Sequence, residues 1–135
     1  MKTVIRLLKT LKSRIYYRKE EKAMTIDELN EKYFFHDSIV ERITYDSEKK
    51  ILELYLDFCF WAQTDYKNTQ PETGKVIVHF FGVNDYTGIT GESDWWGITD
   101  TMLENGTYTV VIDDDYHEVC HRLEINASEA DFVTL

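Results

Sequence analysis

The side chains in this sequence that could carry out acid–base or metal chemistry are four histidines and a large excess of carboxylates. His36 stands directly before Asp37, and enzymes use His–Asp pairs for proton transfer. Neighbouring residues on a strand point to opposite faces, so Asp37 is poorly placed to orient the imidazole beside it. A turn in which Asp37 accepts backbone N–H groups is the simpler interpretation. We therefore predict no catalytic residue at this pair.

The spacing of the other histidines bears on metal binding. His117 and His121 stand four residues apart, a spacing that suits a shared metal on a helix. On a strand it covers about 13 Å, too far for one zinc ion with ligands at about 2 Å. His79 falls on a predicted interior strand, where a hydrogen-bonded core histidine is the commoner case. We predict no metal and no cofactor; the alternative, a metal-dependent enzyme, has His36, Asp37, His79 and His117 as candidate ligands.

Two adjacent tryptophans set among carboxylates give a different signal. Trp95 and Trp96 project in opposite directions on an extended chain, so we expect one indole to be exposed. Aromatic anchors within an acidic rim fit a surface that receives Lys or Arg from another protein. The alternative is one tryptophan closing each end of the core. The acidic run 113–115 lacks the alternating pattern of a calcium loop and indicates a solvated hairpin tip. The predicted binding residues are Glu92, Asp94, Trp95, Trp96, Asp100, Asp113, Asp114, Asp115 and Tyr116.

Charge is distributed very unevenly along the chain. Residues 1–23 hold eight Lys and Arg against two Asp and Glu, whereas residues 24–135 hold seven against twenty-three. The net charges are therefore +6 and −16, consistent with −10 for the whole chain. An acidic body repels nucleic acid and favours cationic proteins. We expect a basic extension over 1–23 and one acidic domain over 24–135, with a basic protein as partner and no nucleic acid.

The basic extension has the pattern of an amphipathic helix over residues 2–17. Its apolar positions recur at spacings of three and four: Val4, Leu7, Leu8, Leu11 and Ile15. The helix could pack on its own acidic domain, pair with another chain to form a homo-oligomer, or lie on anionic lipid. Arg6, Lys9 and Lys12 interrupt any secretory signal, and no run approaches the ~20 apolar residues of a membrane span. We expect a cytoplasmic protein without a membrane span.

The rest of the chain predicts a mainly β domain with one short helix. Thr25 and Glu28 form a capping box that begins a helix over residues 26–33, and Met24 just before it is a second possible start of translation. From Ser38 the apolar period changes to two, the period of strands. Strands are predicted over 38–45, 52–60, 75–83, 86–90, 107–113, 118–126 and 131–134, with an irregular loop up to Gly97. Short connections favour an antiparallel β-sandwich or half-open barrel.

Several of these segments together resemble a group of small bacterial β-rich proteins. The resemblance rests on Phe35-His36-Asp37-Ser38, the Leu52/Leu54/Leu56/Asp57 strand, Val78-x-Phe80-x-Gly82-Val83 and Trp96-Gly97, and covers residues 34 to about 126. Some members of that group look like immunity proteins of polymorphic toxin systems, and others are uncharacterised. The resemblance implies an acidic partner of a basic toxin and no catalytic residues.

Composition, charge and motifs lead to one functional expectation with two alternatives. Phosphate-binding loops, nucleophile elbows, kinase signatures and zinc-finger spacings are absent from the sequence. We expect a non-enzymatic, acidic protein-binding module, of the immunity type on the resemblance. The alternatives are the metal-dependent enzyme and a homo-oligomer assembled through residues 2–17.

Overall fold

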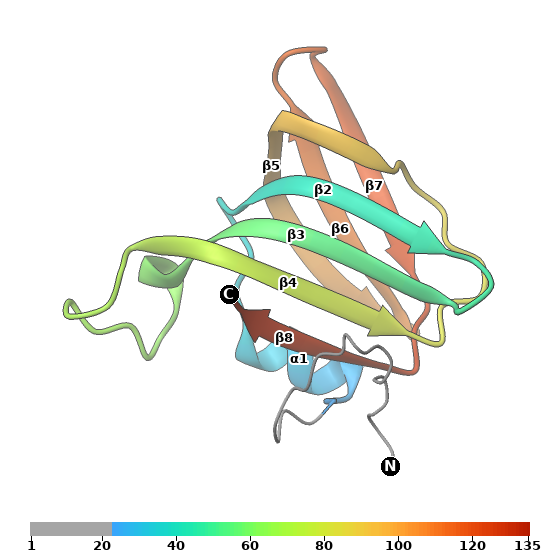
Figure 1. Ribbon diagram of the computed structural model, residues 1–135, viewed down its shortest axis with the longest axis horizontal. Coiled ribbons are helices and arrows are strands. Elements are labelled where there is room, and N and C mark those ends of the chain that lie inside the picture. Colours follow the sequence, from blue (N-terminus) through green and yellow to red (C-terminus); the bar gives the residue numbers. More distant parts are fainter. Residues whose placement is uncertain (1–22) are drawn as a thin grey trace.

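The computed structural model describes residues 23–135, so the amphipathic helix predicted over residues 2–17 lies outside the described residues. One helix, α1 (Ile26–Lys32), precedes seven strands, and a short 3-10 helix, η2 (Phe60–Ala62), follows the second of them (Figure 1). The strands are β2 (Ile39–Asp46), β3 (Ile51–Cys59), β4 (Thr73–Phe81), β5 (Gly91–Glu104), β6 (Thr107–Asp114), β7 (Val119–Ile125) and β8 (Glu129–Thr134).

All seven strands belong to one antiparallel sheet in the order β7-β6-β5-β2-β3-β4-β8. The mainly β, antiparallel character predicted from the sequence is therefore confirmed. The sheet is not closed, because β7 and β8 are its two edges. The finer choice between a sandwich and a half-open barrel stays a prediction. Within residues 23–135, no helix is long and apolar enough to cross a membrane.

Helix α1 begins where the sequence predicts and ends one residue earlier than predicted, at Lys32. The Thr25 hydroxyl accepts the N–H of Glu28 at 3.0 Å, and the Glu28 carboxylate accepts the N–H of Thr25 at 2.8 Å. This capping box satisfies two backbone donors that the first helical turn leaves without partners. Leu29 is fully buried and fixes the helix against the inner face of the sheet, where α1 contacts β5 and β8.

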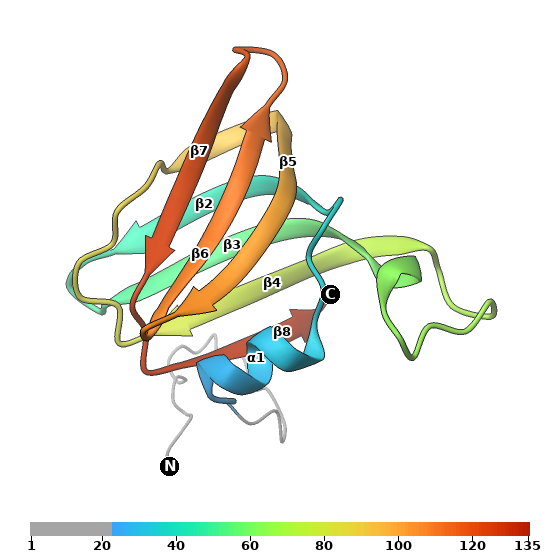
Figure 2. The same cartoon turned by 180° about the vertical axis from the view of Figure 1, so that it is seen from behind.

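The sheet curls so that its inner faces meet in one apolar core. On β3, every second side chain from Leu52 to Phe58 is buried, as the period-two pattern predicts. A cavity of only about 10 Å³ is lined by residues of β3, β4, β5 and β6 together. Strands β5–β7 therefore lie across the inner face of β2–β4, which the two opposite views also show (Figures 1 and 2).

Strand β5 is the largest departure from the predicted elements. The sequence predicts a short strand over 86–90 and an irregular loop to Gly97, but β5 runs from Gly91 to Glu104 and pairs with both β2 and β6. Its apolar period is interrupted because the register shifts between Ile98 and Asp100, where Thr99 donates its hydroxyl to the Val111 carbonyl at 3.4 Å. A bulge of this kind removes the alternation that a sequence pattern depends on.

Candidate functional site

The structure brings the two predicted binding segments into contact at one end of the sheet. Trp95 lies on β5 and Tyr116 lies in the turn between β6 and β7, and their ring centroids are 5.8 Å apart. The N–H of Asp115 donates to the Trp95 carbonyl at 3.3 Å, which ties the turn to the strand. The side chains of Trp95 and Tyr116 are 53% and 68% exposed. Trp95 is thus the exposed indole of the adjacent pair.

Exposed carboxylates stand near these two rings on the same two segments of the chain. We call this region the aromatic–acidic surface and define it as Trp95 and Tyr116 with the exposed acids Glu92, Asp94, Asp113 and Asp115. Glu92 makes an exposed ion pair with Arg42 at 3.3 Å. Across residues 23–135, no ion pair reaches Asp94, Asp113 or Asp115. Their charges face solvent together, and such a field attracts a cationic partner.

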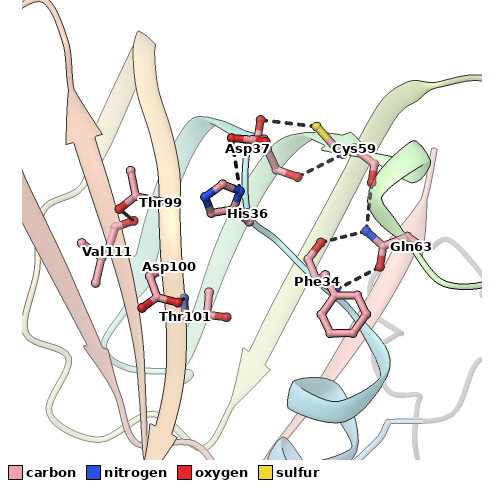
Figure 3. Close-up of polar contacts among 10 residues, drawn as sticks. Phe34, His36, Asp37, Cys59, Gln63, Thr99, Asp100, Thr101 and Val111 are labelled. Carbon is pink, nitrogen blue, oxygen red and sulfur yellow. Dashed lines mark hydrogen bonds and ion pairs between the residues drawn. The ribbon is translucent and has the colours of Figure 1, made fainter.

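Asp100 lies apart from this surface, farther along β5. It pairs with Val111 of β6, and its carboxylate accepts the N–H of Thr101 at 2.9 Å (Figure 3). Its side chain is exposed, but it supports the local backbone of the bulge.

Asp114 does not belong to a solvated tip as predicted, because it is buried. Its carboxylate accepts three hydrogen bonds: from the Trp96 indole at 3.1 Å, from the His117 backbone N–H at 3.0 Å, and from the His117 ring at 2.8 Å. The backbone N–H of His117 is the largest cause that lowers the pKa of Asp114, to about 2. A carboxylate with several donors stays ionised. Asp114 therefore fixes the turn that carries Tyr116, and Trp96 is its buried support.

His117 and His121 also come together here, although the segment is not helical. Their ring nitrogens lie 2.8 Å and 3.8 Å from the same oxygen of Asp114. The distance of about 13 Å expected from the strand rise does not apply, because β7 begins only at Val119 and the chain turns through Glu118 at a φ of 57°. Even so, no group of three or more His, Cys, Asp or Glu side chains in residues 23–135 is arranged to hold a metal.

His79 lies in a different ion cluster, on the outer face of the sheet. Its Nδ1 is 2.6 Å from Asp131 of β8, and its Nε2 is 3.2 Å from Glu53 of β3. Burial of the ring lowers its pKa, but the bonds and charges of the two carboxylates outweigh this and raise it to about 9. The hydrogen bond from His79 likewise lowers the pKa of Glu53 to about 2. Both ring nitrogens are occupied and protonated, so this histidine is neither a base nor a metal ligand at neutral pH.

The pair His36–Asp37 lies in the loop between α1 and β2. His36 Nδ1 is 3.3 Å from the Asp37 carboxylate, so Asp37 contacts the imidazole that it was expected to be poorly placed to orient (Figure 3). The reason is the backbone: Asp37 has a φ of 72° in a turn, where side chains do not alternate as on a strand. Both side chains are more than half exposed, at 64% and 53%.

A polar cluster beside this pair joins the loop to the end of β3 (Figure 3). The Gln63 amide donates to the carbonyls of Phe34 and Cys59 at 2.8 and 2.9 Å, and its oxygen accepts the Phe34 N–H at 2.9 Å. The buried Ser38 hydroxyl accepts the Cys59 N–H at 3.0 Å, and the Cys59 thiol, whose pKa burial raises, donates to the Asp37 carbonyl. These groups bond to backbone, so the cluster is structural.

The structure also shows exposed aromatic side chains that the sequence did not predict. Phe34, which bonds to Gln63, and Trp61 of η2 are 44% and 49% exposed. The dipeptide Phe34-Phe35 gave one available signal, since on an extended chain one of two adjacent aromatics faces outward. Phe35 is the buried one.

Comparisons of the chain with models of protein families, with curated proteins and with solved structures found no match.

Proposed function

We propose that the protein is a non-enzymatic binding module whose aromatic–acidic surface receives a basic protein partner. The observation that supports this most directly is the contact between two rings, Trp95 and Tyr116, that are both more than half exposed. Exposed neighbouring aromatics give a partner a large apolar area to bury. The free carboxylates around them select lysine and arginine and accelerate encounter.

The contacts that hold the two rings in place favour an ordered binding site over a mobile surface loop. Trp95 is held by strand pairing on β5, and the turn that carries Tyr116 is held by the three hydrogen bonds to Asp114. A surface that is ordered before binding loses less conformational entropy when the partner arrives. Asp114 therefore acts as a positioning residue for the proposed binding site.

The resemblance to immunity-type proteins agrees with this proposal and gives the partner a class, a basic toxin. The competing metal-dependent enzyme gains no support from the histidines. His79 is fully bonded to carboxylates, and His36 and His117 lie in separate turns.

A synthetic peptide rich in arginine and lysine, with a matched peptide rich in aspartate, tests the proposal. Stopped-flow tryptophan fluorescence of the full chain should show binding of the basic peptide alone, with an association rate that falls as salt is added. Trp95→Ala should weaken binding about tenfold or more, as loss of an aromatic anchor does. The matched control Trp61→Ala removes a similarly exposed indole of η2, outside the aromatic–acidic surface, and should leave affinity unchanged.

The acids are tested separately. Asp94→Asn with Asp115→Asn should slow association, whereas Asp27→Asn with Asp65→Asn changes the net charge equally at distant exposed positions and should not. Equal effects of the two tryptophan variants, or of the two charge variants, would show that any binding is unspecific attraction to an acidic protein and would contradict the proposed site.

A further inference from the structure

The outer face of the sheet carries a second acidic region, far along the sheet from the aromatic–acidic surface. The registers place one residue of each of four neighbouring strands in a single cross-strand row: Thr44, Glu53, His79 and Asp131. The Glu53 carboxylate accepts the hydroxyls of Thr44 at 2.9 Å and Tyr55 at 3.1 Å. This row has two carboxylates and one histidine, and Asp57 and Glu129 lie on the same face of β3 and β8. Lys75 of β4 pairs with Glu41 of β2 at 2.7 Å and lies 4.0 Å from Asp57, so the face holds more acidic than basic side chains but is not wholly without cations.

Apolar side chains flank that row on both sides. Tyr55, Ile77 and Val133 follow one another across β3, β4 and β8 in the next row, and the Phe81 ring stacks on His79 with centroids 5.9 Å apart. The Arg42 guanidinium lies over the Tyr55 ring, 4.8 Å from its centroid, so Ile77 and Val133 form the apolar part of the proposed surface. Most of these side chains are only partly buried. An apolar face with an acidic row through it is complementary to a segment that combines apolar and basic side chains.

The route of the chain identifies such a segment. Met24 forms an isolated antiparallel bridge with Ala130 of β8, with N–H to carbonyl distances of 2.7 and 2.9 Å. The antiparallel direction places Ala23, the first described residue, next to Asp131 at the end of the acidic row. Those residues, 1–22, contain eight Lys and Arg and the apolar positions that define the predicted amphipathic helix.

We propose that residues 1–22 dock within their own chain on the outer face of β3, β4 and β8, with apolar side chains on Ile77 and Val133 and basic side chains at the accessible carboxylates Glu53 and Glu129. The occupant comes from the same chain because a short tether gives an effective concentration in the millimolar range, far above that of a second copy in dilute solution. This assignment goes beyond the proposed function: it gives the basic segment a surface of its own and leaves the aromatic–acidic surface to an external partner.

Zero-length carbodiimide cross-linking of the full chain tests the proposal. An equal mixture of ¹⁴N- and ¹⁵N-labelled protein is treated, digested and read by mass spectrometry. We expect amides between lysines of residues 1–22 and the accessible outer-face acids Glu41, Glu53, Asp57 and Glu129, in peptides of one isotope only. Links in mixed-isotope peptides would mean that the segment pairs with a second chain. Links to Glu92, Asp94, Asp113 or Asp115 would place it on the aromatic–acidic surface, and no links at all would mean that it does not dock on the outer face. Each of these three outcomes overturns the proposal.

Limited trypsin digestion gives a second, independent readout. Docking should protect the sites within residues 1–22, so Lys9→Glu with Lys12→Glu should accelerate cleavage about tenfold at the sites that both proteins keep, Arg14 and Arg18, by repulsion from the outer-face acids. The matched control, Lys49→Glu with Lys67→Glu, makes the same charge change in two exposed turns and should leave the rate unchanged. Equal cleavage rates in all three proteins would overturn the proposal. Neither readout uses an external partner, so its failure is distinct from failure of the proposed function.

Discussion

Raising the pH from 6.5 to 9 should remove a substantial part of the free energy of unfolding through one side chain, His79. The histidine lies between Asp131 at 2.6 Å and Glu53 at 3.2 Å, and its side chain is only 14% exposed. Its folded-state pKa of about 9 means that the folded protein keeps a proton that the unfolded chain releases at a pKa of 6.5. Below pH 6.5 both states are protonated and the stabilisation is complete; above it, stability declines until the folded protein titrates as well.

The size of the effect follows from the difference between the two pKa values. A change from 6.5 to about 9 corresponds to at most about 3 kcal/mol of stability. The lowered pKa of Glu53, about 2 against 4.5, describes the same ion pair from its other partner and is not added. Its sign is opposite: the contribution of Glu53 is complete above pH 4.5 and is lost as the pH falls through 2.

Urea unfolding followed by tryptophan fluorescence measures this directly. With roughly 1–3 kcal/mol lost per molar urea, the midpoint should fall by at most about 1–3 M between pH 6.5 and 9. His79→Gln should be less stable at pH 6.5, because two carboxylates lose their cation, and its midpoint should then change little over the same range. His36→Gln, a change at an exposed histidine, is the control and should behave as the wild type. A constant wild-type midpoint, or an equally steep decline in His79→Gln, would refute the reasoning.

Three further predictions concern groups that fix the backbone. Asp114→Ala should reduce the loss of folding stability on acidification. The pKa of Asp114 is lowered from 3.8 to about 2, so this carboxylate stabilises the folded protein fully above pH 3.8 and no longer does so near pH 2. Acid unfolding followed by tryptophan fluorescence measures the difference. Ser38→Ala should cost about 1–3 kcal/mol, since the buried Cys59 N–H loses its acceptor, whereas Ser47→Ala in an exposed turn should be neutral in thermal unfolding. Thr25→Ala should cost about 1 kcal/mol and increase amide exchange in α1, and unchanged exchange would contradict the capping role.

The elements that could be read from the sequence are those whose signal is local. The α1 boundary is set by Thr25 and Glu28, whose side chains bond to backbone within the same turn. Strand β3 is recognisable because one face of it is buried without interruption, so its alternation is regular. Strand β5 was missed because its bulge breaks the period, and because its pairing with β2 and β6 is a long-range property that no single segment carries.

The candidate site divides in the same way. The exposed acids and the expectation of one exposed indole could be predicted from residue types and alternation. The burial of Asp114 could not, because its donors include Trp96, which lies eighteen residues away in sequence on the paired strand. The contact between Trp95 and Tyr116 likewise depends on which strands are neighbours.

The sequence by itself determined the excess of negative charge, the predominance of strands and the helix cap, because charge, side-chain period and capping are properties of a residue and its immediate neighbours. The tertiary structure alone decided which carboxylates are partnered by histidines, which tryptophan is exposed and which two segments form one surface. Those outcomes depend on strand order and register, which bring residues of distant segments to within a few ångströms of one another.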